Sequence, residues 1–182
     1  ILAAWGMFLL AKKLAGFWSG ILSSCLYTYF FYHAVNIYVR GALAEFFSMA
    51  LLPFIVLAFY NLYRQTNLKN SLSLGLVIAL SILTHPLIAF PAVFYWLILS
   101  VFFFWLKKNQ RWLLLRQLII AAAFGLSLSA FFWLPSLVEK QYTLVDAVLT
   151  KELASYKIHF VFLSQLWQSA WGYGGSGAGL AD

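Results

Sequence analysis

The residues from Leu72 to Leu106 form a stretch of 35 positions that contains no Asp, Glu, Lys or Arg. About 20 helical residues cross a hydrocarbon core of about 30 Å, so this stretch is too long for one span and slightly short for two. Thr84-His-Pro86 and Pro91 interrupt it. Because proline removes a backbone donor and disfavours helix at the preceding residue, we predict a hairpin of two shortened or tilted helices that bends near His85. One kinked helix with a re-entrant piece is the alternative.

The composition places the rest of the chain in a bilayer as well. Hydrophobic residues make up 64% of the 182 positions and charged residues 9%, whereas about a quarter of the residues in an ordinary soluble domain are charged. The net charge of +7 does not indicate nucleic-acid binding, because the basic residues are split into small clusters between apolar runs. The single Cys25 excludes a disulfide framework. These features predict an all-α, polytopic transmembrane helical bundle.

We predict five to six membrane segments, at residues 1–11, 17–32, 42–62, 72–84, 87–106 and 112–134. The first is too short to span, and we expect it to be the tail of a truncated helix in an internal piece of a larger protein. Pro135 is expected to end the last segment. Residues 136–182 are more polar and are predicted to form an extracytoplasmic segment with an interfacial helix and a glycine-rich loop.

The basic residues predict the orientation of these segments. Eight of the 12 fall on one side of the predicted topology, beginning with a basic turn at Lys12 and Lys13; the others are Arg64, Lys69, Lys107, Lys108, Arg111 and Arg116. This side is expected to be cytoplasmic, because cytoplasmic loops carry an excess of Lys and Arg. All five acidic residues fall on or near the opposite face, as do the three histidines if the hairpin forms. A polar site is therefore expected on the extracytoplasmic face.

Arg40 and Glu45 in Tyr38-Val-Arg-Gly-Ala-Leu-Ala-Glu45 are the first candidates for that site. Ionisable groups inside membrane segments are costly and usually face a cavity or a partner. Arg40 could snorkel to the interface with Glu45 as its partner. Alternatively, a fixed cation beside a carboxylate at the mouth of an outward cavity would suit a phosphate-bearing substrate, because a guanidinium grips phosphate with two hydrogen bonds.

Three further polar residues are candidates on the same face. His85 could be satisfied by a backbone carbonyl at a helix break, or it could contact substrate or donate a proton near neutral pH. His33 lies in the polar link from 33 to 41 that precedes the third segment. Glu139 follows Phe131-Phe-Trp-Leu-Pro135 and is either an interfacial charge or a second carboxylate of the site. The histidines lack the spacing of metal ligands, so we predict no metal site.

The C-terminal stretch adds two aromatic candidates, Trp171 and Tyr173. Gly172-Tyr-Gly-Gly-Ser-Gly177 formally matches G-x-G-x-x-G, but no strand precedes it and no helix follows, so dinucleotide binding is not indicated. A close-packed loop that could cover a substrate is the alternative. Phe160, Leu163 and Trp167 precede it at near-helical spacing, which is typical of a helix on the membrane surface or packed on the bundle.

These motifs together resemble a known family. Tyr38-Val-Arg-Gly-Ala-Leu-Ala-Glu45, Leu51-Leu-Pro53, Thr84-His-Pro86, Phe131-Phe-Trp-Leu-Pro135 and Trp171-Gly-Tyr-Gly-Gly-Ser176 are similar to those of bacterial polytopic membrane proteins labelled "6-pyruvoyl-tetrahydropterin synthase-related". That family resembles the GT-C class of membrane glycosyltransferases. The resemblance does not imply pterin chemistry, because a pterin synthase is a soluble α+β enzyme with a histidine-bound zinc.

The GT-C likeness implies sugar transfer from a polyprenyl-phosphate donor to a lipid or glycan acceptor, on the outer face of a bacterial plasma membrane. In that class the catalytic acid lies in a first outer loop, which these residues do not include, so no catalytic residue is assigned. Arg40 would hold the donor phosphate, and no cofactor is expected. A transporter or flippase and a non-catalytic envelope-assembly protein are the alternatives; internal repeats of the helix pattern, which are not visible here, would favour a transporter.

Overall fold

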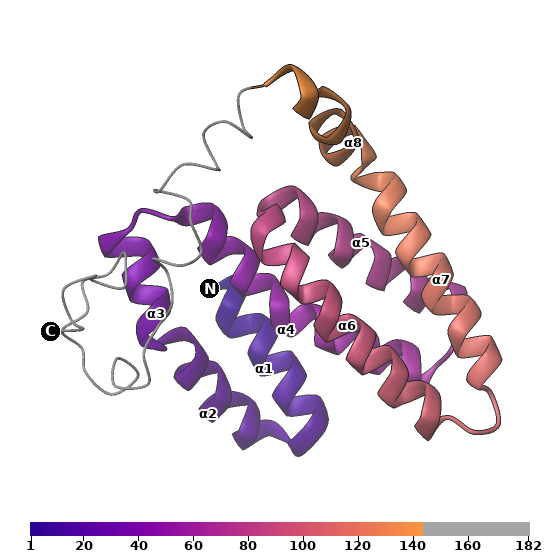
Figure 1. Ribbon diagram of the computed structural model, residues 1–182. Coiled ribbons are helices and arrows are strands. Elements are labelled where there is room, and N and C mark those ends of the chain that lie inside the picture. The colour runs from indigo at the N-terminus through magenta and orange to yellow at the C-terminus, as the bar shows by residue number, and fades with distance from the viewer. Residues whose placement is uncertain (144–182) are drawn as a thin grey trace, which may run out of the picture. The chain divides into compact units, whose positions relative to one another are not determined.

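The computed structural model describes residues 1–143, and this part of the chain is helical without strands, as Figure 1 shows. The predicted all-α class is confirmed for these residues. The chain divides into two units, Ile1–Trp133 and Leu134–Asp182, which are described separately. The elements are α1 (Leu2–Ala15), α2 (Phe17–Thr28), α3 (Phe31–Ala34), a π-helical turn η1 (Val35–Val39), α4 (Leu43–Arg64), α5 (Leu68–Thr84), α6 (Pro86–Leu106), α7 (Arg111–Leu128), α8 (Ala130–Glu139) and a 3-10 turn η2 (Lys140–Tyr142).

Three of the described helices are long and apolar enough to cross a membrane. They are α4, α6 and α7, with 22, 21 and 18 residues. Helix α5 has 17 residues, and α1 and α2 have only 14 and 12, which at 1.5 Å per residue fall well short of about 30 Å. The chain is therefore a membrane protein with three candidate spans in the described part, and the predicted count of five to six is not confirmed.

The predicted hairpin between Leu72 and Leu106 is present as two helices. Helix α5 ends at Thr84, α6 begins at Pro86, and His85 between them has extended backbone angles. Proline is favourable at the first position of α6, because a backbone N–H at that position would have no acceptor within the helix. A single kinked helix is excluded. Helix α5 begins at Leu68, four residues earlier than predicted, where the Asn67 side chain accepts a hydrogen bond from the Asn70 N–H and caps the helix.

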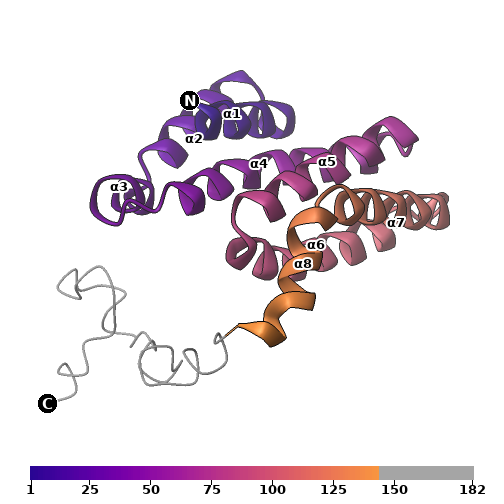
Figure 2. The ribbon, with the colours of Figure 1, turned by 90° about the horizontal axis from the view of Figure 1, so that it is seen from above.

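The helices of the first unit form three layers (Figure 2). The antiparallel pair α1 and α2 forms the first layer, α4 and α5 form the second, and α6 and α7 form the third. Helix α1 packs on α4, α4 packs on α5, and α5 packs on α7. Helices α5 and α7 approach so closely that a Cβ atom added to Gly75 would lie 2.6 Å from the Ala121 carbonyl oxygen. Ser71 also donates a 2.6 Å hydrogen bond to Gln117 across this interface. Small residues and buried polar pairs are the usual means by which membrane helices associate.

Three predicted boundaries are corrected. Lys12 and Lys13 do not form a turn but lie in the last turn of α1, where their charges favour the carbonyl end of the helix. The segment 33–41 is not an open link, because α3 and η1 occupy most of it. The helix predicted from residue 112 does not continue to Pro135. Helix α7 ends at Leu128, and the hydroxyl of the next residue, Ser129, donates to the Gly125 carbonyl. Pro135 lies inside α8.

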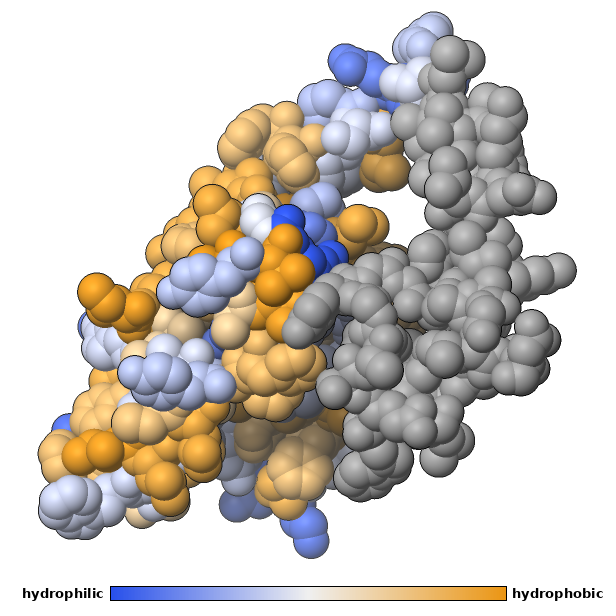
Figure 3. Space-filling view, turned by 90° about the vertical axis from the view of Figure 1, so that its left-hand side faces the viewer, coloured by the Kyte–Doolittle hydropathy of each residue, from blue (hydrophilic) through white to orange (hydrophobic). Residues whose placement is uncertain are grey.

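Most basic residues of the first unit gather at one of its ends. The end where α1, α4 and α6 finish and α5 and α7 begin carries the eight basic residues predicted to share one side (Figure 1). Glu45 is the single acidic residue of residues 1–133 and lies at the start of α4. Between the ends the surface is largely hydrophobic, as Figure 3 shows for the face viewed from the left of Figure 1. This distribution fits an integral membrane protein.

Candidate functional site

The candidate site is built on one face of α3 and η1. Tyr32, Asn36 and Arg40 recur every four residues, which places them in a row along that face. The turn between them is a π-helix: the Arg40 N–H donates to the carbonyl of Val35, five residues earlier. Single π-helical turns are rare and are often found at functional sites. Gly41 then adopts a positive φ of 63°, which turns the chain into α4.

The row converges on the Glu45 carboxylate. The Tyr32 hydroxyl donates a 2.7 Å hydrogen bond to Glu45 Oε1, and Asn36 Nδ2 donates a 3.4 Å hydrogen bond to the same oxygen. Arg40 Nη1 lies 3.0 Å from each oxygen of the carboxylate. Arg40 Nη1 also donates to Asn36 Oδ1 at 2.8 Å and to the Tyr32 hydroxyl at 2.9 Å. We call Tyr32, Asn36, Arg40 and Glu45 the polar corner. The polar corner supplies hydrogen bonds to the carboxylate of Glu45, a residue that is only 7% exposed.

The donors of the polar corner differ in what they leave available to a ligand. All hydrogen bonds of Arg40 within the described residues leave from Nη1, and its side chain is 37% exposed. Hydrogen bonding to Glu45 raises the pKa of Arg40, so the guanidinium stays charged. Burial raises the pKa of the Tyr32 phenol, which stays protonated and can donate. Among residues 1–143, the Nε and Nη2 edge of Arg40 is therefore left for another acceptor.

A proline in α4 ties the corner to α2. Pro53 has no N–H, so the carbonyl of Met49, four residues earlier, lacks its helical donor. The Tyr27 hydroxyl of α2 supplies the missing hydrogen bond at 2.7 Å. The Met49 sulfur in turn lies 3.5 Å from Asn36 Nδ2. Neighbouring side chains commonly satisfy backbone groups that proline frees in membrane helices, and here that contact also positions Asn36.

His33 is buried beside the corner rather than in it. Its side chain is 2% exposed, and neither ring nitrogen has a hydrogen-bond partner in the part of the chain that the structure describes. The rings of Tyr27, Phe46 and Phe30 surround it at centroid distances of 4.8, 5.3 and 6.5 Å, each nearly perpendicular to the imidazole. Burial lowers the pKa of His33, and the nearby carbonyls of Thr28 and Tyr27, in poor hydrogen-bonding geometry, offset this only in part. His33 is therefore held neutral among aromatic rings.

His85 caps a helix. Its Nδ1 accepts a 3.2 Å hydrogen bond from the Ile88 N–H in the first turn of α6. The bond involves a backbone N–H and not the carbonyl that the sequence suggested. In the described residues no hydrogen bond or ion pair links His85 to the polar corner.

The remaining predicted site residues lie elsewhere. Glu139 is exposed and ends α8, in the second unit. Trp171 and Tyr173 lie outside the described residues, as do the predicted interfacial helix and glycine-rich loop. Among residues 1–143, no group of three His, Cys, Asp or Glu side chains is placed to hold a metal ion.

Tyr32 and Asn36 supply two of the three donors to Glu45, yet reasoning from the sequence does not single them out. The sequence places Tyr32 at the end of an aromatic-rich segment and Asn36 in a polar link. The spacing of four residues from Tyr32 through Asn36 to Arg40 is the signal that could have identified both.

Comparison with known proteins gives one match. The family model for the 6-pyruvoyl-tetrahydropterin synthase related domain, a membrane protein family, matches residues 1–176. No curated protein and no solved structure matches the chain. The match covers nearly the whole chain and agrees with the three apolar helices of membrane-spanning length. The chain therefore belongs to the family of membrane proteins with a 6-pyruvoyl-tetrahydropterin synthase related domain.

Proposed function

We propose that this chain is part of a membrane glycosyltransferase of GT-C type, in which the polar corner binds the phosphate of a polyprenyl-phosphate-linked sugar on the extracytoplasmic face. The observation that carries the proposal is the unused edge of Arg40. Nε and Nη2 of a guanidinium form a fork that matches two oxygens of a phosphate. Because Nη1 is held by Glu45, Asn36 and Tyr32, the fork is oriented before a ligand arrives.

Glu45 acts in this proposal by positioning Arg40. Its Oε1 already receives hydrogen bonds from Tyr32, Asn36 and Arg40, and the residue is buried. A carboxylate in these surroundings is a poor direct contact for a phosphate, since the two negative charges would repel. The contacts therefore favour support of Arg40 by Glu45 over contact of Glu45 with the substrate.

An apolar pocket near the corner has the chemistry of a polyprenyl chain. It has a volume of about 540 Å³ and is lined by residues of α1, α2, α4 and α6: Met7, Leu10, Tyr27, Leu52, Pro53, Val56, Ile88, Pro91, Ala92 and Tyr95. Tyr27, which donates to the Met49 carbonyl, and Pro53, which leaves that carbonyl without a helical donor, both line the pocket. Met49 thus contacts both Tyr27, which lines the pocket, and Asn36 of the polar corner. A phosphate at Arg40 and the start of an isoprenoid chain in this pocket form one amphipathic binding site.

Replacement of Arg40 by lysine in the full-length protein tests the proposal. The lysine side chain would keep a positive charge beside Glu45 but lose the two-pronged grip, so we expect a loss of about tenfold in affinity for a fluorescent short-chain polyprenyl phosphate in nanodiscs. Arg116→Lys is the matched control, because Arg116 is exposed on α7 far along the chain from the corner. Equal affinity of the Arg40→Lys variant and the control would refute phosphate binding by Arg40.

A structural role is the second candidate function. The hydrogen bonds among the members of the polar corner favour it, because they already satisfy the Glu45 carboxylate. Arg40 and Glu45 bind each other, and both bind Tyr32 and Asn36, which fixes the start of α4 against η1 without any ligand. A non-catalytic envelope-assembly protein would need no more than this. In that case Arg40→Lys would lower the midpoint of thermal unfolding and leave polyprenyl-phosphate binding unchanged, whereas the proposed function requires a loss of binding in a folded variant.

A further inference from the structure

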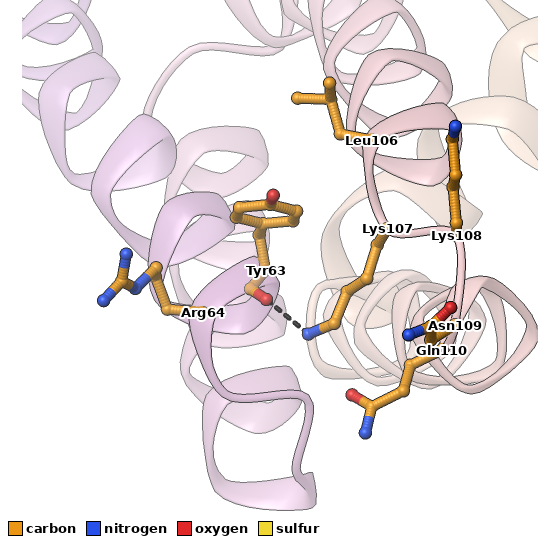
Figure 4. A pocket seen from close by; sticks show the side chains of 7 residues that line it. All are labelled: Tyr63, Arg64, Leu106, Lys107, Lys108, Asn109 and Gln110. Carbon is orange, nitrogen blue, oxygen red and sulfur yellow. Dashed lines mark hydrogen bonds between the residues drawn. The ribbon is translucent and has the colours of Figure 1, made fainter.

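A second polar pocket lies at the basic end of the first unit, between the end of α4 and the loop from α6 to α7 (Figure 4). Its volume is about 600 Å³, and its lining residues are Tyr63, Arg64, Leu106, Lys107, Lys108, Asn109 and Gln110. Arg64 and Lys108 are exposed and line the pocket, Arg64 from the end of α4 and Lys108 from the loop after α6, and in Figure 4 their charged groups point away from Lys107. The pocket combines cations and amide groups with an apolar rim.

Lys107 forms a fixed wall of this pocket. Its ammonium donates to the Tyr63 carbonyl and to the Thr66 hydroxyl, so it closes the carbonyl end of α4. It also lies 5.5 Å from the centre of the Tyr63 ring. These contacts hold a positive charge in place instead of leaving it on a mobile side chain. Burial lowers the pKa of Lys107, which is the cost of holding an ammonium there without a carboxylate partner.

The charge in this pocket has no counter-charge in the described part of the chain. Glu45 and Glu139 are the acidic residues of positions 1–143, and neither lines the pocket. Neither Arg64 nor Lys108 forms an ion pair with a described residue. The N-terminal end of α7 adds to the positive field, because Gln110 makes no side-chain cap and leaves the first N–H groups of the helix without that partner. An anion from outside the chain would complete the pocket.

The position of the pocket along the helices identifies the source of that anion. The apolar spans α4 and α6 end at Arg64 and Leu106, and α7 begins at Arg111. Trp105 and Trp112 flank the loop and are both 68% exposed, as expected for aromatic residues at a membrane interface. Phosphate headgroups lie at this depth, and basic pockets between membrane helices bind acidic headgroups. A lipid phosphate is therefore available at the pocket in high local concentration.

We propose that this pocket binds the phosphate of an anionic phospholipid, with Lys107 as the fixed wall and with Arg64 and Lys108, whose exposed side chains turn inward on binding, as its cationic ligands. Asn109 and Gln110 would donate to the remaining headgroup oxygens. The site lies at the opposite end of the helices from the polar corner and does not depend on sugar transfer. A bound lipid there would link the end of α4 to the start of α7 across the loop.

The test measures phosphatidylglycerol binding by the full-length protein with native mass spectrometry and by the shift in its midpoint of thermal unfolding in mixed micelles. The pocket variant is Arg64→Gln with Lys108→Gln. The matched control is Lys12→Gln with Lys69→Gln, which removes the same charge from the same end outside the pocket. Each basic residue near anionic lipid contributes roughly fivefold in affinity, so we expect the pocket variant to bind at least about tenfold more weakly than the control.

Three results would overturn the proposal. Equal losses in the two double variants would mean that the whole basic end attracts lipid without a site. Equal binding of phosphatidylcholine and phosphatidylglycerol would remove the requirement for an anionic headgroup. A thermal shift with inorganic phosphate as large as that with phosphatidylglycerol would assign the pocket to free phosphate. Lys108→Gln alone, at an exposed loop position, provides a variant for the same comparison if the double variant does not fold.

Discussion

The close contact of α5 with α7 predicts that Gly75→Ala destabilises the protein. The added Cβ would lie 2.6 Å from the Ala121 carbonyl oxygen and 3.3 Å from the Gly125 nitrogen, whereas ordinary contact begins at 3.4 Å. These two obstacles are backbone atoms, so the helices must separate by about 0.8 Å, which puts the cost in the upper part of the range for overpacking, about 2–3 kcal/mol. The better helix propensity of alanine returns about 1 kcal/mol. We expect a net loss of about 1–2 kcal/mol.

The separation would also strain the hydrogen bond from Ser71 to Gln117, one turn away on the same interface. Polar contacts between membrane helices contribute about 0.6 kcal/mol on average, so this loss belongs within the same range. Equilibrium unfolding of the full-length protein by titration with sodium dodecyl sulfate in mixed micelles would measure the difference in free energy.

Gly6→Ala is the matched control. Its Cβ would come even closer to another atom, at 2.5 Å, but that atom belongs to the half-buried ring of Phe54, which can turn aside. We expect a cost below about 0.5 kcal/mol, because only a side chain must move and the better helix propensity of alanine, about 1 kcal/mol, offsets the cost of moving it. If Gly6→Ala costs as much as Gly75→Ala, or if Gly75→Ala is neutral, then a rigid backbone contact does not set the distance between α5 and α7.

Two further predictions concern the histidines. The lowered pKa of His33 means that the unfolded chain binds a proton near pH 6.5 more readily than the folded chain, so stability should fall as the pH drops through about 6.5. Thermal unfolding between about pH 8 and about pH 5 measures this slope, and His33→Phe should flatten it; an unchanged slope would assign the titration to another group. His85→Ala removes the cap of α6 and should cost about 1 kcal/mol, whereas His85→Asn, which can accept from the Ile88 N–H, should restore most of it. Equal unfolding of both variants would show that the cap contributes nothing.

The hairpin around His85 could be predicted because its cause is local. Proline cannot continue α5, yet it is favoured at the first position of α6, so the break follows from Thr84-His-Pro86 alone. The meeting of Arg40 with Glu45 was also foreseeable from their charges and separation. The break at Ser129 could not be predicted in the same way because no proline marks it; its hydroxyl bonds to the carbonyl of the preceding turn.

The rest of the polar corner depends on a feature that hydrophobic periodicity does not reveal. Polar residues between 33 and 41 predict a link, but α3 and the π-helical turn carry Asn36 into full burial. A π-helical turn adds one residue to the local repeat and changes which side chains share a face. The four-residue spacing could have placed Tyr32 and Asn36 on one face with Arg40, but their hydrogen bonds to Glu45 become visible only with the backbone in place.

The bond between the Tyr27 hydroxyl and the Met49 carbonyl makes two distant positions depend on each other. Pro53 leaves the Met49 carbonyl without a helical donor, and the Tyr27 hydroxyl of α2 supplies a hydrogen bond in its place. We therefore expect the two residues to be linked in evolution. A descendant that replaced Pro53 would restore the helical hydrogen bond and leave the hydroxyl without its acceptor, while one that lost Tyr27 would bury an unpaired carbonyl. Neither change alone is neutral, so the proline and the tyrosine are expected to persist together or to disappear together.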